Sequence, residues 1–213
     1  MIYIGMDLSG PSNIKDTAIA VFEEDAHNEL ICIRAVTGID DIDVMNLINE
    51  LKVKDSLAAG LDSPLSYNNR GGDRPGDTEL RKKLTKAGML SGSVMVPTFN
   101  RMVYLTLRGI SIARMLKQIC PGIKIAEIHP GGAMVLRGAP VEDVKGIKSS
   151  MDSRINLLNW LDGQGLKNFP KEKPIDHFVA ACACALGVWK WTKNEAIWIH
   201  PAEAPIHPFD YVC

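Results

Sequence analysis

The sequence has no hydrophobic run long enough to cross a membrane, and Met1 leads directly into a predicted strand rather than into a basic segment with an apolar core. It also has no excess of one charge, because 24 Lys and Arg balance 25 Asp and Glu. The five cysteines are odd in number and lack zinc-ribbon spacing. We therefore expect a cytoplasmic protein with reduced thiols, in which any binding to nucleic acid depends on a local basic patch.

The length of 213 residues suits one large domain, residues 1–213, with room for an insertion and a sizeable core. The first ten residues predict a buried strand with Asp7 on one face, because alternate side chains of a strand face opposite ways. The pattern Gly-x-Asp ends this strand at Gly5 and Asp7, and it recurs at Gly60 and Asp62 at the end of a second apolar strand. In each copy the glycine precedes the acid on its own face, and its missing side chain predicts room for another group there.

Two carboxylates on neighbouring strands, about 4.8 Å apart, would repel each other unless a cation lay between them. Mg²⁺ and Mn²⁺ prefer oxygen ligands and bind through a few carboxylates together with water or phosphate. The repeated pair therefore favours a divalent metal site at Asp7 and Asp62. The alternative is that each acid only caps the loop that follows its strand.

Hydrophobic periodicity and turn residues predict an ordered set of elements. Two strands follow the first in an antiparallel meander, and a helix capped by Asp40 or Asp41 leads to the strand of Asp62. A crossover helix between strands favours parallel pairing, which places Asp62 beside Asp7. The predicted strands are 1–10, 17–24, 29–37, 56–65, 124–130 and 196–200; the predicted helices are 41–51, 77–87, 97–120, 151–161 and 175–191; the predicted loops are 66–76, 141–150 and 167–174.

Residues 66–87 predict a polar, mobile loop followed by a short helix capped by Asp77. The segment carries six cations against three acids, which is typical of a solvated face. Beside a carboxylate cluster it is also suited to holding a phosphate backbone, although no aromatic residues interleave with these cations. The cations are Arg70, Arg74, Arg81, Lys82, Lys83 and Lys86.

The predicted strand 124–130 carries Glu127 and His129 on one face. His129 is interpreted as a ligand, a proton carrier or a hydrogen-bonded structural histidine, whereas an acid on an otherwise apolar strand favours a functional role for Glu127. A late helix rich in small residues begins with Asp176. Small residues let a helix lie close to a sheet, which would bring Asp176 to the strand-end acids; alternatively, Asp176 only stabilises the helix N-terminus.

Five stretches in this order resemble a family of unknown function, domain of unknown function 429 (DUF429), whose members are predicted RNase H-like nucleases. The resemblance covers most of the chain. The stretches are Ile4-Gly5-Met6-Asp7-Leu8, Gly60-Leu61-Asp62-Ser63-Pro64-Leu65, Arg74-x-x-Asp77-x-x-Leu80-Arg81, Glu127-Ile128-His129-Pro130 and the helix of Asp176.

The resemblance implies an α/β, RNase H-like fold: a mixed five-stranded sheet, three strands antiparallel and two parallel, with helices on both faces and a helical insertion at roughly 66–122. It implies Asp7, Asp62 and Asp176 as metal-binding acids, with Glu127 an additional catalytic candidate. It assigns no chemical role to the Arg74, Asp77 and Arg81 motif.

The leading functional hypothesis is hydrolysis of phosphodiester bonds in RNA or DNA with two Mg²⁺ or Mn²⁺ ions, about 4 Å apart. Arg74, Arg81, Lys82 and His129 are the candidate substrate-binding residues. Two alternatives remain: an inactive RNase H-like binding or scaffold protein, and an actin-like ATPase half-domain, since actin-like ATPases and sugar kinases share this kind of core.

Overall fold

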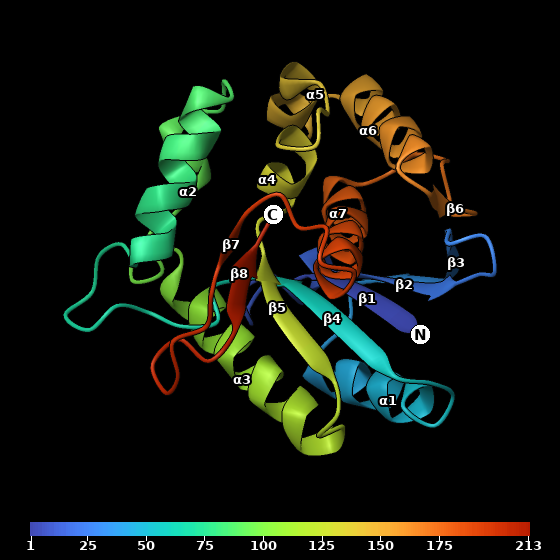
Figure 1. Cartoon of the computed structure of the whole chain (residues 1–213), viewed down its shortest axis with the longest axis horizontal. Helices are drawn as coiled ribbons and strands as arrows, with labels where there is room; N and C mark the ends of the chain where they lie inside the picture. The colour runs from blue at the N-terminus through green and yellow to red at the C-terminus, as the bar shows by residue number, and fades with distance from the viewer.

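The computed structural model describes residues 1–213 and has a single eight-stranded sheet with helices on both faces (Figure 1). The strand order is β6-β3-β2-β1-β4-β5-β8-β7. The strands are β1 (Ile2–Asp7), β2 (Ala18–Glu24), β3 (Leu30–Thr37), β4 (Leu57–Asp62), β5 (Lys124–Ile128), β6 (Leu166–Lys167), β7 (Ile199–His200) and β8 (Asp210–Val212).

The central five strands follow the predicted pattern. β1, β2 and β3 pair antiparallel, and β4 and β5 continue the sheet parallel to β1. The α-helices are α1 (Asp41–Leu51), α2 (Pro75–Lys86), α3 (Val103–Ile119), α4 (Pro130–Val135), α5 (Val141–Gly146), α6 (Met151–Gly163) and α7 (Asp176–Thr192). Antiparallel meander, crossover helix and parallel strands together form the RNase H-like fold that the family resemblance implies, and β6, β7 and β8 extend its five strands to eight.

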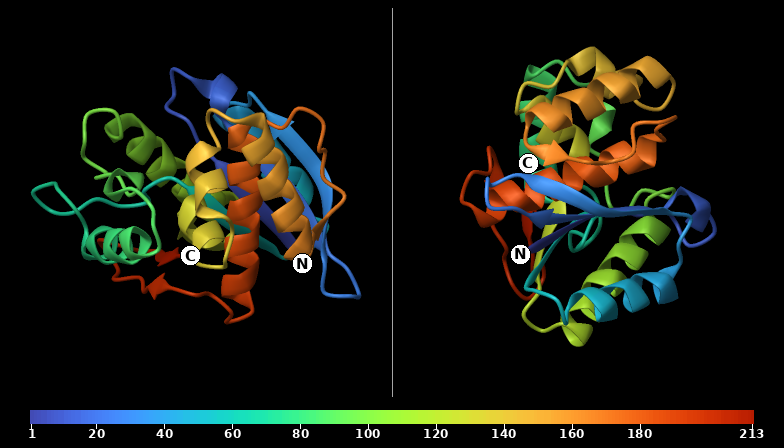
Figure 2. Two further views of the ribbon diagram at one scale, coloured as in Figure 1. Left: turned by 90° about the horizontal axis from the view of Figure 1, so that it is seen from above. Right: turned by 90° about the vertical axis from the view of Figure 1, so that its right-hand side faces the viewer.

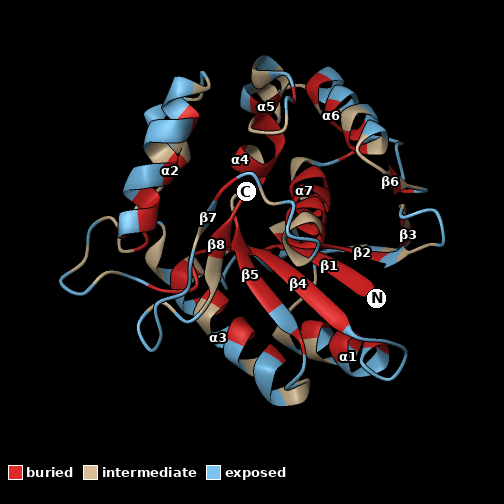
Figure 3. Cartoon of the chain, viewed as in Figure 1, coloured by how far each residue is buried: buried red, intermediate tan, exposed pale blue.

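Two apolar layers enclose the sheet. α1 and α3 pack on one face with Ile4, Met6 and Leu61, whereas α7 covers the other face with α4, α5 and α6 around it (Figure 2). Strands β1 and β4 and helix α7 are buried almost throughout (Figure 3). The alternating apolar residues of β1 are therefore covered on both sides, and its carboxyl end opens between the two layers.

Helix α2 stands at the edge of the sheet (Figure 1). Its Leu80 and Leu84 pack with Tyr211 and Trp198 of the C-terminal segment in a third, smaller core. Strand β8 forms there because residues 210–212 pair parallel to β5, and β7 then adds the predicted edge strand. Strand β8 was not predicted, since three residues in a proline-broken tail have no readable periodicity.

Several predicted boundaries of helices and loops differ from those in the structure. Residues 141–150 are not only a loop, because α5 forms at Val141–Gly146, and α4 begins directly after β5 at Pro130. Helix α3 begins at Val103 rather than at Pro97. Asp77 does not cap α2, which begins at Pro75; it lies in the first turn, where its carboxylate accepts the backbone N–H of Arg74 at 2.8 Å. No helix is both long enough and apolar enough to span a membrane.

Candidate functional site

A cavity of about 380 Å³ lies at the carboxyl ends of β1, β4 and β5. Side chains from these strands, from α2 and α7, and from the loops between them line it. The acids in its wall are Asp7, Asp62, Asp77, Glu127 and Asp176. Such a concentration of carboxylates in one pocket is electrostatically costly without compensating charge, which identifies this cavity as the candidate functional site.

Asp7 and Asp62 are directly paired across the parallel strands β1 and β4, as predicted. Burial raises the pKa of Asp7, and a hydrogen bond with His177 offsets part of this effect. The pKa of Asp62 is raised well above its ordinary value by burial and then by the charges of Asp7 and Glu127. No hydrogen-bond donor offsets this effect at the Asp62 carboxylate, and only the charge of Lys148 lowers its pKa.

Helix α7 lies directly against the glycines that precede these acids. A methyl group on Gly5 would lie 1.8 Å from the carbonyl oxygen of Ala181, and one on Gly60 would lie 2.6 Å from that of Cys184. Both atoms belong to the backbone of α7. The room that the sequence predicts at these glycines is therefore present, and the backbone of α7 occupies it.

This close packing fixes where α7 begins, and it brings Asp176 to the cavity that Asp7 and Asp62 line. The next residue, His177, makes the closest contact: its Nδ1 lies 2.7 Å from Oδ2 of Asp7. Its Nε2 lies 3.9 Å from Asp16 and 4.0 Å from Asp176. The hydrogen bond to Asp7 raises the pKa of His177.

Arg74 connects the first turn of α2 to the central sheet. Its Nη1 donates to Glu127 Oε2 at 2.7 Å, and its Nη2 donates to Asp77 Oδ1 at 2.8 Å. The guanidinium lies 5.1 Å from the centre of the Tyr211 ring. Burial opposes its charge, but the carboxylates of Glu127 and Asp77 more than compensate and raise the pKa of Arg74. Arg74 and Asp77 of the motif without an assigned role therefore form a buried ion cluster with Glu127.

Glu127 lines the cavity with both carboxylate oxygens engaged. Besides Arg74, it accepts the backbone N–H of Leu65 at 2.8 Å, which holds the chain leaving β4. Its geometry is that of an anchor for α2 and for this loop. Metal ligation by Glu127 requires that these hydrogen bonds be exchanged.

The other candidate substrate-binding residues lie in different surroundings. His129 is partly buried and caps α4, where its Nδ1 accepts from the N–H of Gly132 at 2.8 Å, and desolvation lowers its pKa. Arg81 is paired with Asp73 at 2.7 Å and donates to the carbonyl of Val94. Lys82 is exposed on α2. Of these residues only His129 lines the cavity, as Arg74 does.

Sequence reasoning missed His177, Lys148 and Arg108. His177 was detectable as the neighbour of Asp176 on the same first turn. Lys148 lies after α5, in a stretch interpreted as a loop of low information; it lines the cavity, and its charge lowers the pKa values of Asp7 and Asp62. Arg108 reaches from α3 to the carbonyl of Ser9 at 2.9 Å, and so holds the chain after Asp7 in place.

The donor set fits a hard divalent cation in its chemistry, because Asp7, Asp62 and Asp176 offer oxygen ligands and the Asp62 carboxylate has no hydrogen-bond donor. In the present side-chain positions, however, these acids do not surround a cation, since no group of three or more His, Cys, Asp or Glu side chains is placed to hold a metal ion. The contact between His177 and Asp7 occupies one of the required oxygens.

Comparisons with known proteins give a family and one structural likeness. Residues 5–205 match the family model described as "Protein of unknown function (DUF429)". Among solved structures, the chain is similar to T. thermophilus RuvC in complex with Holliday junction substrate, with 10% sequence identity, a TM-score of 0.41, and 92% of this chain and 98% of that chain covered. No curated protein matches the sequence.

Proposed function

The chain belongs to the protein family of unknown function DUF429, and we propose that it is a metal-dependent phosphodiester hydrolase, a nuclease with an RNase H-like fold. One observation supports this most strongly. Two carboxylates, Asp7 and Asp62, are paired in register at the ends of parallel strands, and Asp176 joins them at one cavity from the start of α7. Their mutual repulsion is relieved most directly by bound Mg²⁺ or Mn²⁺.

Asp7, Asp62 and Asp176 are the residues that would hold the cation or cations. When bound, such ions lower the pKa of an attacking water and stabilise the leaving oxygen of a phosphodiester. His177 holds the Asp7 carboxylate through Nδ1, and a cation bound to the same oxygen would have to displace this contact. Lys148 adds a positive charge beside the same acids, where a substrate phosphate would lie.

Arg74 and Glu127 would support this site by holding the surrounding chain in place. Because Glu127 is anchored to Arg74 and Leu65, it fixes the loop after β4 and the first turn of α2 on the cavity rim. For Glu127 to serve as a fourth metal ligand, its hydrogen bonds with Arg74 would have to break. The substrate-binding role of Arg81 and Lys82 would extend along α2, outside the cavity.

A second candidate function, an inactive RNase H-like scaffold, is favoured by a specific observation. His177 Nδ1 already lies 2.7 Å from Oδ2 of Asp7, and no three His, Cys, Asp or Glu side chains are placed to hold one metal ion. A protein that keeps this hydrogen bond permanently would bind no metal and would hydrolyse nothing.

Manganese binding and cleavage separate these two functions. Mn²⁺ should raise the melting temperature of the wild type and stimulate cleavage of a mixed set of labelled RNA and DNA substrates. Asp7→Asn should fold, but lose at least ~100-fold in cleavage, because loss of even an outer-shell partner of a metal site costs about 10- to 100-fold. Asp152→Asn, on the exposed side of α6, is the matched control and should behave as the wild type.

Asp62→Asn supplies a readout that does not depend on activity. In EDTA this variant should melt at a higher temperature than the wild type, since it removes one of two facing carboxylates. With Mn²⁺ the order should reverse. A wild type that neither binds Mn²⁺ nor cleaves any substrate would refute the hydrolase and favour the scaffold.

A further inference from the structure

Exposed aromatic side chains are confined to one part of this molecule. Of five Phe, four Tyr and four Trp residues, only Tyr67, Phe99 and Tyr104 are exposed, at 52%, 52% and 68% of their surface. All three lie in the segment between β4 and β5. Single exposed aromatic residues need no explanation, but the complete set in one segment indicates a surface that contacts something else.

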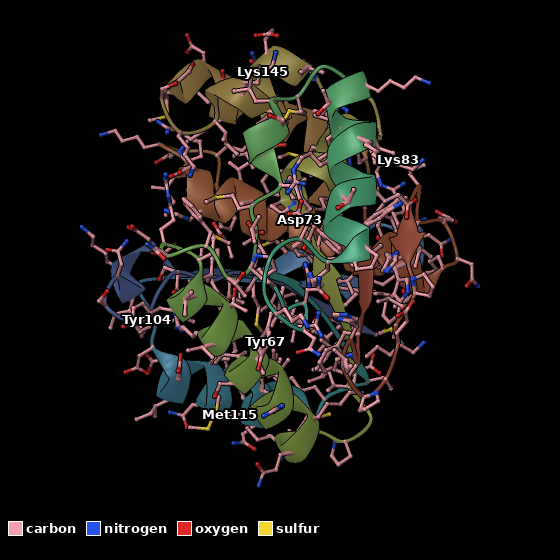
Figure 4. All side chains as sticks on the ribbon, turned by 90° about the vertical axis from the view of Figure 1, so that its left-hand side faces the viewer. Tyr67, Asp73, Lys83, Tyr104, Met115 and Lys145 are labelled. Carbon is pink, nitrogen blue, oxygen red and sulfur yellow. The ribbon has the colours of Figure 1, made fainter.

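The three rings belong to two loops and a helix start that contact each other. The backbone N–H of Gly72 donates to Oγ1 of Thr98 at 3.0 Å, which joins the loop of Tyr67 to the loop of Phe99. Tyr104 follows in the first turn of α3. In Figure 4, Tyr67 and Tyr104 are labelled on the side of the molecule that carries α2 and α3.

This surface borders the candidate site. Met102 and Leu105, on either side of Tyr104 in the chain, line the cavity, whereas Tyr104 and Leu107 are exposed one turn apart on the outer side of α3. The cavity wall also contains four methionines, whose flexible, polarisable side chains fit flat ligands of varied shape. These are Met89, Met95, Met102 and Met134.

The charge of the surface is positive. Arg70 and Arg101 are exposed and make no ion pair, and the Arg101 guanidinium lies 5.7 Å from the centre of the Phe99 ring. Asp73, the acid of the Tyr67 loop, is already paired with Arg81. We call Tyr67, Phe99, Tyr104, Arg70 and Arg101 the aromatic platform.

From this arrangement we infer that the substrate is a single-stranded nucleic acid whose bases stack on the aromatic platform before the strand enters the cavity. The inference rests on the proposed function and names its substrate class. Aromatic rings bind any base through its face, and guanidinium groups bind both phosphates and rings, which is the usual composition of a single-strand binding surface. Duplex bases hide their faces in the stack, so a duplex gains only the phosphate contacts.

Fluorescence anisotropy in EDTA measures this binding without cleavage. The probes are labelled oligo(dT) and oligo(U) of about 20 nucleotides and a duplex of matched length. The single strands should bind more tightly than the duplex. Tyr104→Leu and Phe99→Leu should each weaken single-strand binding at least about five-fold, since a stacked ring contributes roughly 1–3 kcal/mol per base. Tyr104→Phe keeps the ring and should bind as the wild type.

Each outcome has a definite meaning. Equal binding of duplex and single strand, or unchanged binding by both leucine variants, would overturn the inference. The absence of any nucleic-acid binding would also overturn it and would indicate that the aromatic platform binds a protein partner instead. Ring-dependent binding by a wild type that cleaves nothing with Mn²⁺ would support the platform and refute the hydrolase. Far-UV circular dichroism verifies that these surface variants fold.

Discussion

The contact between α7 and the sheet predicts a graded effect of three glycine substitutions on stability. In Gly5→Ala the new methyl carbon would lie 1.8 Å from the Ala181 carbonyl oxygen and 2.5 Å from the Ala185 nitrogen. Real methyl carbons essentially never approach within 3.0 Å, so α7 or β1 must move by about 1 Å. Overpacking costs typically 1–3 kcal/mol, and because backbone cannot rotate away we expect a loss of about 3 kcal/mol or more.

Gly60→Ala should cost less, about 1–3 kcal/mol, because one of its two closest contacts is the movable side chain of Ile128 at 2.8 Å. Gly122→Ala is the control: its methyl group would have no neighbour within 4 Å, and the change should be neutral or stabilising by up to about 1 kcal/mol.

Equilibrium unfolding in urea, followed by far-UV circular dichroism, gives the free energies of unfolding, and an unchanged m-value shows that the unfolded states are comparable. The predicted order of stability is Gly122→Ala, Gly60→Ala, Gly5→Ala. If Gly5→Ala unfolded within about 0.5 kcal/mol of the wild type, close backbone packing would not be the reason for this glycine.

Two further predictions concern buried charge and buried thiols. Arg74→Met should lower the free energy of unfolding by about 3–5 kcal/mol, because Glu127 and Asp77 are left buried without a cation. Arg81→Met breaks a more exposed pair and should cost about 1 kcal/mol or less in the same urea titration. Equal losses in the two variants would contradict this distinction between a buried and an exposed ion pair. Ellman's reagent should detect one rapidly reacting thiol in the native protein, that of the partly exposed Cys120, and all five in guanidinium. Burial raises the pKa values of Cys32, Cys182, Cys184 and Cys213, which keeps these thiols protonated. Raising the pH from about 7 to about 9 should therefore release no second fast thiol, and two or more fast thiols at the lower pH would refute this burial.

The central sheet was predictable because its signals are local and repeated. Period-two alternation marks β1 and β4, and a repeated Gly-x-Asp at their ends implies the same register, which the pairing of Asp7 with Asp62 confirms. Asp40 caps α1 through a capping box, as a residue before an apolar stripe should. Helices of six residues and strands of two or three residues have too few positions for periodicity, which is why α4, α5 and β8 were missed.

The side-chain environment of the site was less predictable, because its contacts join distant parts of the chain. Arg74 meets Glu127 across 53 positions, and His177 meets Asp7 across 170. A glycine pattern also has two physical meanings, since the missing side chain admits a ligand or a neighbouring backbone equally well. Only the position of α7 distinguishes them at Gly5 and Gly60.

Where α7 crosses β1 and β4, peptide groups touch the glycines with no side chain between them. The distance between Asp176 and the two strand acids is therefore set by contacts between main-chain atoms, and the dimensions of the main chain do not depend on the sequence. Core residues elsewhere in the two layers can diverge and repack over evolution while this spacing stays constant, provided that both glycines are retained.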